Sequence, residues 1–220
     1  KWTDGGDYRG GLIMKLGILT SIFGNYNFEQ VLDMTSEFGL ECMEVACWPQ
    51  GEGERRYAGV CHIDCENFTD EEAHTIINKC EEKKIFISAL GFYANLMDEN
   101  LEKRKENIQH FMKVIDVSAK LNINMVTGFL GRMQHKTLEE NLKAVKEIWT
   151  PIIHYAESKK VRIAIENCPM LFTQDEWPGG QNIMTSPDNW RKIFEILDSD
   201  YFGINYDPSH FVWQQMDYIR

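Results

Sequence analysis

The 220-residue sequence contains no apolar run close to the about 18 residues that a membrane-spanning helix needs. Its first residues also lack the apolar core of a secretory signal peptide. Positive charge is scarce, since 23 lysine and arginine residues face 34 aspartate and glutamate residues, which gives a net charge of −11. A nucleic-acid backbone or an anionic membrane would therefore be repelled on average. These absences predict a cytoplasmic protein with no nucleic-acid partner and no membrane partner.

Nucleotide-binding signatures are absent as well. No strand-like segment is followed by G-x-G-x-x-G or by a Walker lysine motif. The sequence has six cysteines, but a domain of this size without a secretory signal has little need of disulfides, so free thiols are expected. The cluster of Cys61, His62 and Cys65 offers soft metal ligands, yet no second pair at zinc-finger spacing follows it. A structural zinc site is therefore not expected.

What the sequence does contain is a regular alternation of buried strands and amphipathic helices. Strands that alternate with helices of this length pair in parallel through right-handed crossovers. This leaves a doubly wound sheet or a (β/α)8 barrel, and polar residues at the carboxyl ends of several strands favour the barrel. The six predicted strands are Leu16–Leu19, Cys42–Ala46, Ile85–Leu90, Met125–Gly128, Arg162–Glu166 and Phe202–Tyr206.

Three helix starts are marked by their capping residues, and one helical stripe contains a proline. Because Pro151 falls inside the apolar stripe that begins at Leu142, a kink or a break is expected there. The capping signals are the capping-box pairs Thr69–Glu72 and Thr137–Glu140, and Ser186–Pro187, an N-cap before a first-turn proline.

Only six of the eight βα units of a complete barrel are visible in the sequence. The expected fold class is therefore α/β, of the (β/α)8 TIM-barrel type and incomplete at its C-terminal end. Residues 1–13 are glycine-rich and aperiodic, and are expected to be a leader or an expression remnant. Residues 14–220 are expected to form one barrel domain that lacks the last two βα units.

Acidic side chains follow two neighbouring predicted strands. A carboxylate at the rim of a dry barrel is costly unless a cation or hydrogen bonds compensate it, so Glu166 is a candidate metal ligand or catalytic base. Alternatively, it caps loop amides or pairs with Arg132. One strand later, Asp207 and His210 stand three residues apart just past a strand end, so both can point at one centre. Divalent ions accept both carboxylate and imidazole ligands, and Glu166, Asp207 and His210 are therefore a candidate partial metal site. Alternatively, Asp207 bonds its own downstream amides in a turn and His210 starts a helix.

Several segments resemble the sugar phosphate isomerase/epimerase family of xylose-isomerase-like barrels, and the resemblance runs from about Met14 to the end of the chain. It implies a divalent cation, often manganese or magnesium, held by Glu166, by Asp207 and by a histidine and a glutamate of the seventh and eighth strands, which have no counterpart here. It also implies that His210 binds substrate first and the metal second. The segments are Ile165–Met170, Glu176–Gly180 and Tyr206–Gln214, with weaker marks at Tyr57–Asp64 and Thr127–Arg132.

The reaction implied by the resemblance is proton transfer beside a carbonyl. The metal polarises the carbonyl and neighbouring hydroxyl of a ketose, one carboxylate takes the proton through an enediolate, and a second returns it. Glu166 would be one of these carboxylates, and the eighth-strand glutamate would be the other. The expected function is a metal-dependent sugar or sugar phosphate isomerase/epimerase, and a homo-oligomeric assembly stays open. The 220-residue chain alone is expected to be inactive or much weakened.

Five further residues are secondary candidates for substrate binding. Glu44 and Trp48, at the end of the second strand, could line the floor and wall of the site, or be a solvated strand end and a packed aromatic. His62 sits in a long loop, and Arg132 follows the fourth strand. Trp177 stands before a Pro-Gly-Gly sequence that suggests either a lid or an ordinary turn.

Three other functions stay open at this point. An endonuclease acting at abasic DNA sites would carry histidines at the third and fourth strand ends, but Gly91–Asn95 and Gly128–Gly131 contain none and the net charge opposes DNA. A dehydratase of cyclic polyols would share the metal ligands and cannot be separated by sequence. A non-catalytic barrel that binds a sugar or assembles with a partner is the third alternative.

Overall fold

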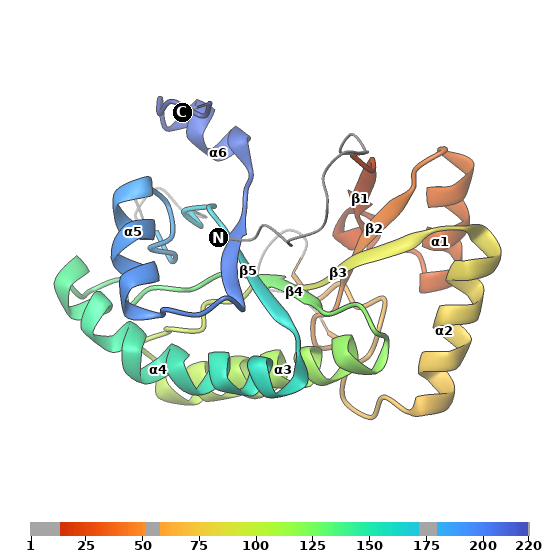
Figure 1. Cartoon of the computed structure of the whole chain (residues 1–220), viewed down its shortest axis with the longest axis horizontal. Coiled ribbons are helices and arrows are strands. Elements are labelled where there is room, and N and C mark those ends of the chain that lie inside the picture. Colours follow the sequence, from red (N-terminus) through yellow and green to blue (C-terminus); the bar gives the residue numbers. More distant parts are fainter. Residues whose placement is uncertain (1–13, 52–57, 172–179, 220) are drawn as a thin grey trace.

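The computed structural model describes residues 14–51, 58–171 and 180–219, in which parallel strands alternate with helices (Figure 1). The strands form one sheet in sequence order, and every pair in it is parallel. Sequential order is the topology of a (β/α)8 barrel, whereas a doubly wound sheet reverses its order. The strands are β1 (Gly17–Leu19), β2 (Cys42–Ala46), β3 (Phe86–Phe92), β4 (Met125–Gly128), β5 (Arg162–Glu166) and β6 (Phe202–Asn205).

All six predicted strands are confirmed, and β2, β4 and β5 have the predicted bounds. In the part of the chain that the structure describes, β1 and β6 each pair on one side only. The predicted fold class is therefore confirmed as a barrel-type parallel sheet of six strands that does not close. The cysteine prediction also holds, because all six cysteines are free.

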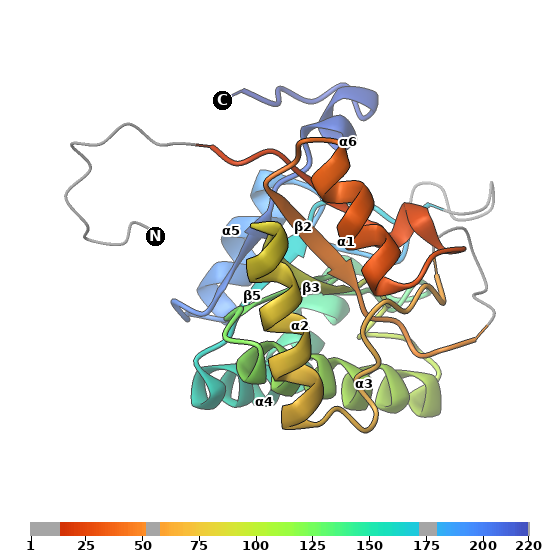
Figure 2. The same ribbon diagram turned by 90° about the vertical axis from the view of Figure 1, so that its right-hand side faces the viewer.

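The helices pack outside the sheet. Helices α3 and α4 lie side by side along one face (Figure 1), while α1 and α2 cover the region of β2 and β3 (Figure 2). No helix within the described ranges combines the length and apolarity needed to cross a bilayer. The helices are α1 (Phe28–Glu37), α2 (Asp70–Lys83), α3 (Leu101–Lys120), α4 (Leu138–Lys159), α5 (Pro187–Ile196) and α6 (Pro208–Trp213), with a 3₁₀ turn η1 (Thr20–Phe23) after β1.

The predicted capping signals at Thr69, Thr137 and Ser186 are all confirmed as N-caps. The start of α1 was not predicted, although Asn27 and Gln30 form a capping box there. Of the kink or break expected at Pro151, the break is wrong, since α4 continues through this residue to Lys159.

The core between the sheet and α3 and α4 is built around Trp149. This side chain is fully buried and packs edge-on against Phe111 and Phe202, with ring centroids 6.1 and 5.9 Å away. Its indole N–H donates to the carbonyl of Leu130 at 3.1 Å, so the one polar atom of the ring is satisfied. Trp149 thereby ties α4 to α3, to the loop after β4 and to β6.

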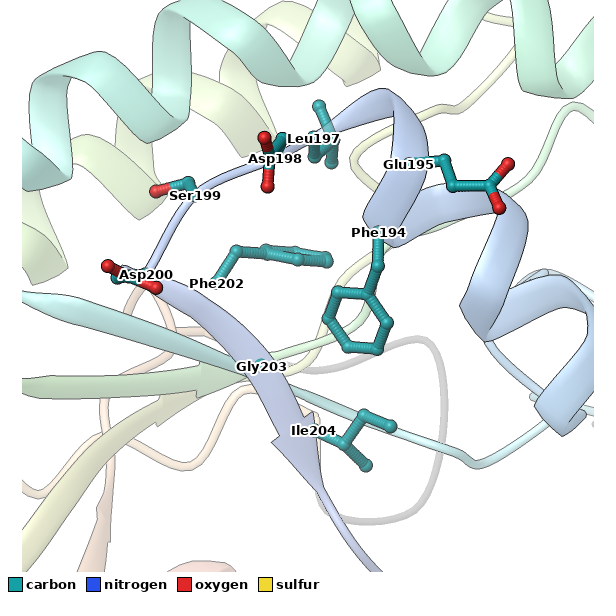
Figure 3. A pocket seen from close by; sticks show the side chains of 9 residues that line it. All are labelled: Phe194, Glu195, Leu197, Asp198, Ser199, Asp200, Phe202, Gly203 and Ile204. Carbon is teal, nitrogen blue, oxygen red and sulfur yellow. The ribbon is translucent and has the colours of Figure 1, made fainter. Parts of the chain in front are cut away.

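An open groove of about 780 Å³ runs along the unpaired side of β6, between this strand and α5 (Figure 3). Apolar rings and side chains form its floor, with Phe194, Phe202 and Ile204 among them. None of the predicted site residues that the structure describes lines this groove. It belongs to the open edge of the incomplete barrel.

Removing the Trp149 ring should strongly destabilise the fold. Trp149→Ala creates a large cavity in the core and should lower the free energy of unfolding by about 3–5 kcal/mol in urea denaturation. Trp149→Phe keeps an aromatic ring and should cost less. A free energy of unfolding for the alanine variant within about 1 kcal/mol of the wild type would contradict this view of the core.

Candidate active site and metal centre

The candidate site lies where β5 and β6 end. The parallel register pairs Glu166 with Asn205, so the two segments that follow emerge at the same edge of the sheet. The next residue of the first segment, Asn167, is fully buried and its side chain pairs with the backbone of Asp207. Its Nδ2 donates to the Asp207 carbonyl at 2.9 Å, and its Oδ1 accepts from the Asp207 N–H at 2.7 Å. These two hydrogen bonds hold the two segments together.

Three predicted residues meet at this point. The Nε2 atom of His210 lies 3.0 Å from Oε1 of Glu166 and 3.4 Å from Oδ2 of Asp207. The side chains of Glu166 and His210 are only 17% and 18% exposed, while that of Asp207 is 40% exposed. Two carboxylates therefore flank one imidazole N–H at the carboxyl end of the sheet.

The Asp207 carboxylate performs two tasks with different oxygens. Its Oδ1 accepts from the backbone N–H of Ser209 at 2.8 Å and caps the short helix α6. This is the turn geometry that was the alternative interpretation of the sequence. Its Oδ2 faces His210 instead, so capping α6 does not remove the carboxylate from the cluster.

Cys168 joins the cluster, although the sequence did not single it out for the site. Its sulfur, a carboxylate oxygen of Glu166 and a ring nitrogen of His210 all lie within 4.8 Å of one another. Asn182, also buried, donates from Nδ2 to the carbonyls of Glu166 and Cys168 at 3.0 and 2.7 Å. The backbone on both sides of Asn167 is thus fixed by a second asparagine.

The second ring nitrogen of His210 is also engaged. The indole N–H of Trp213 donates to Nδ1 at 3.2 Å, and an indole has no acceptor, so Nδ1 must offer its lone pair. In the neutral ring, Nε2 then carries the hydrogen and donates to Glu166. Burial lowers the pKa of His210, while the Cys168 sulfur and the Glu166 carboxylate raise it by more, to about 10. The hydrogen bond from Trp213 favours a lower pKa of His210, because it needs the lone pair on Nδ1, which only the neutral ring has.

A second carboxyl group lies deeper in the barrel. Oε1 of Glu44, on β2, accepts hydrogen bonds from the Thr127 hydroxyl at 2.7 Å and from the Tyr93 hydroxyl. The Tyr93 oxygen in turn accepts from Nδ2 of Asn205 at 3.2 Å. A side chain at Gly91 would place its Cβ 2.8 Å from Oε1, so glycine leaves the space that this network occupies. The network crosses the inner face from β2 to β6.

The electrostatics of this interior raise the pKa of Glu44. Burial raises its pKa most, the hydrogen bonds from Thr127 and Tyr93 lower it, and the nearby Glu166 charge raises it further. Burial and the same two carboxylates also raise the pKa of the Tyr93 hydroxyl well above its usual value. The site therefore contains one carboxyl at the rim and one in the interior, in different environments.

Of two secondary candidates, Trp48 lies beside this network and His62 lies away from it. Trp48 is buried and stacks on Tyr93, with ring centroids 5.8 Å apart and an angle of 25° between the planes. His62 is buried against η1, where its ring nitrogens lie 2.9 Å from Oγ1 of Thr20 and 3.3 Å from the carbonyl of Phe23. Burial lowers the pKa of His62. The structure brings neither side chain to Glu166.

The remaining secondary candidates are Arg132 and Trp177. Arg132 follows β4, where Asn95 accepts from its backbone N–H at 2.9 Å and donates to its carbonyl at 2.8 Å. Burial lowers the pKa of the Arg132 guanidinium. Trp177 lies outside the described residues. Among those that are described, Glu166, Cys168 and His210 form the only group of three candidate metal ligands, so Cys61, His62 and Cys65 do not form one.

The sequence held signals for some of the residues that were missed. Asn167 and Cys168 belong to the same polar segment as Glu166, directly after β5. Thr127 is a buried hydroxyl residue within an otherwise apolar strand. Tyr93 and Asn205 carry no comparable signal, because only the curvature of the sheet brings their side chains together.

Comparison with known proteins agrees with this architecture. Residues 32–220 match the family model of the xylose isomerase-like TIM barrel. No curated protein matches the chain. Three solved structures share its fold: a D-psicose 3-epimerase in the presence of D-fructose (TM-score 0.68, 16% identity, 93% of this chain, 67% of that one), an L-ribulose 3-epimerase (0.68, 11%, 93%, 64%) and the probable 3-DHS dehydratase AsbF of Bacillus anthracis (0.66, 15%, 93%, 67%).

The chain thus spans about two thirds of the length of these structures, and identities this low show a shared fold only. The family match covers most of the chain and includes β2 to β6 with the residues of the cluster. The chain belongs to the xylose isomerase-like TIM barrel family.

Proposed function

We propose that this chain is the main part of a divalent-metal-dependent isomerase or epimerase that acts on a ketose sugar or sugar phosphate. The observation that carries the proposal is the meeting of Glu166, Asp207 and His210 at the ends of two adjacent parallel strands. Carboxyl ends of strands are where barrel enzymes place their chemistry. Two of the solved structures with this fold are sugar epimerases.

The donor atoms at this site fit a divalent cation. Carboxylate oxygens from Glu166 and Asp207 lie around one point, with the Cys168 sulfur beside them. These side chains would hold the ion, and a bound ion would polarise the carbonyl and the neighbouring hydroxyl of the substrate. Within the described residues, these carboxylates receive hydrogen bonds from the His210 ring and, for Asp207, from the Ser209 N–H.

Glu166 is the proposed base. The hydrogen bond from His210 fixes Oε1, which leaves Oε2 to take the proton from the carbon beside the carbonyl. His210, whose orientation is set by Trp213, positions this carboxylate and can donate to a substrate oxygen at the same place. Return of the proton to the opposite face of the same carbon gives epimerisation, whereas return to the neighbouring carbon gives isomerisation.

Glu44 is the proposed binding group for a substrate hydroxyl. Thr127 and Tyr93 hold Oε1, so the carboxyl keeps one orientation and its Oε2 is left for a ligand. A neutral carboxyl in a buried site can donate a hydrogen bond at neutral pH. Trp48, stacked behind Tyr93, would support this floor of the site without touching the substrate.

The first test is metal content. Wild-type protein, loaded with Mn²⁺ and then dialysed, should retain about one ion per chain, since the described residues contain one cluster of donor atoms. Glu166→Gln should lose most of it, because the amide carries no charge. The exposed Glu195→Gln on α5 is the matched control and should retain the ion. Equal metal content in the wild type and Glu166→Gln would count against the proposal.

The second test concerns Glu44 and pH. A carboxyl whose pKa is raised in the folded state contributes stability below its unfolded pKa of about 4.5, and this contribution is lost as the pH rises through the folded pKa. Glutamine keeps an acceptor for Thr127 and Tyr93 but cannot ionise. Glu44→Gln should therefore be more stable than the wild type at pH 7 and equally stable near pH 4, in urea unfolding.

The opposite trend would show that Glu44 is stabilised as an anion. In that case the wild type would gain stability over Glu44→Gln as the pH rises from 4 to 7. Glu139→Gln, on the exposed face of α4, controls for the general effect of removing a negative charge.

A further inference from the structure

We propose that the Cys168 thiolate is a ligand of the cation at this site, so that the site selects a sulfur-accepting metal such as Zn²⁺ or Co²⁺ over Mg²⁺. The inference rests on the proposed function, because it names the class of metal for the same site. The geometry behind it comes from the residues themselves. An oxygen, a sulfur and a nitrogen donor lie within 4.8 Å of one another, at Glu166, Cys168 and His210.

The spacing suits a single ion. Two ligands that are each about 2.0–2.3 Å from one metal can lie at most about 4.6 Å apart. The observed limit of 4.8 Å is close to this value, so a small movement of the side chains would bring the donors to bonding distance. Cys168 and Glu166 are two residues apart on a segment whose carbonyls are both held by Asn182, so their relative position is largely fixed.

The surroundings of the sulfur favour its acceptor role. The backbone N–H of Met170 donates to Sγ of Cys168 at 3.4 Å, and a ring nitrogen of His210 lies within 4.8 Å of the same sulfur. Met170 adopts a left-handed backbone conformation, with φ at 56°, while its side chain is buried. The turn that aims this N–H at the sulfur is therefore anchored by core packing.

His210 is less suited than Cys168 to be the third ligand. A metal-binding histidine usually donates its other ring N–H to an acceptor. Here the other nitrogen, Nδ1, accepts from Trp213, and Nε2 points its hydrogen at Glu166. The Nε2 nitrogen lies 3.0 Å from the Glu166 carboxylate and 3.4 Å from that of Asp207, with the Cys168 sulfur within 4.8 Å of Glu166 and His210. A cation that took the place of the Nε2 hydrogen would have Glu166 and Cys168 as its ligands, with the Asp207 carboxylate beside it.

This set of ligands determines the choice of metal. Mg²⁺ takes oxygen ligands, whereas Zn²⁺ and Co²⁺ accept thiolate as well. As the metal–sulfur bond forms, the thiol proton is released to solvent. The Glu166 carboxylate and the thiolate then balance the charge of a doubly charged ion, with the Asp207 carboxylate beside them.

The test is a cobalt titration of the full 220-residue chain. Metal-free protein is titrated with Co²⁺ alone under anaerobic conditions, while near-ultraviolet absorbance reports thiolate-to-cobalt charge transfer and equilibrium dialysis reports binding. The wild type should develop the charge-transfer band in proportion to bound Co²⁺. Cys168→Ser should lose the band and bind Co²⁺ at least about tenfold more weakly. Its affinity for Mg²⁺ should change much less.

A matched control and a second variant keep the result interpretable. Cys42→Ser alters a half-buried cysteine at the start of β2, which is the end of the sheet away from the site, and should keep the band. Cys168→Ala, compared by circular dichroism, replaces Cys168→Ser if the latter misfolds. Co²⁺ binding without the band in the wild type, or an unchanged band in the Cys168 variants, would overturn this inference and leave the proposed function standing. Failure of the wild type to bind any divalent ion would overturn both.

Discussion

Buried asparagines hold the carboxyl edge of this barrel together. Asn167 pairs through both atoms of its amide with the backbone of Asp207, and Asn95 pairs in the same way with the backbone of Arg132. In each case the loop after one strand is bound to the loop after the next. Leaving such a buried amide unpaired would cost about 1–3 kcal/mol, so each pair resists separation. The distance between the Glu166 and Asp207 side chains is set by the first of these pairs.

From this constraint follows the division of the site into a rim and an interior. At the rim, carboxylates, a thiol and an imidazole share a small volume in which no protein cation other than His210 compensates the charge within the described residues. In the interior, Glu44 is surrounded by hydroxyl groups and is driven towards its neutral form by burial. Two carboxyl groups in different environments are a common arrangement for proton transfer.

The strands could be predicted closely because buried parallel strands are continuous apolar runs. The prediction for β3 ended early, since Gly91 and Phe92 continue the pairing with β4 beyond the apolar run. Pro151 does not interrupt α4 because Trp149 and Ile152, on either side of it, are buried, and their packing outweighs the loss of one backbone hydrogen bond.

The rim of the site could also be predicted, because the ends of parallel strands share one edge. Glu166, Asp207 and His210 meet there as the spacing suggested. The interior could not, since the register between β2 and β3, which shifts between Met43 and Glu44, decides that the Glu44 side chain meets Tyr93. Sequence alone also does not tell which way a loop side chain faces, and His62 turns towards η1.

The account depends on one cation bound between the ends of β5 and β6. Anomalous diffraction from crystals grown with Mn²⁺ tests this most directly. We expect a single strong peak about 2.0–2.4 Å from a carboxylate oxygen of Glu166, with the Asp207 carboxylate on the same peak. Peaks confined to surface carboxylates, with none beside Glu166, would contradict the account.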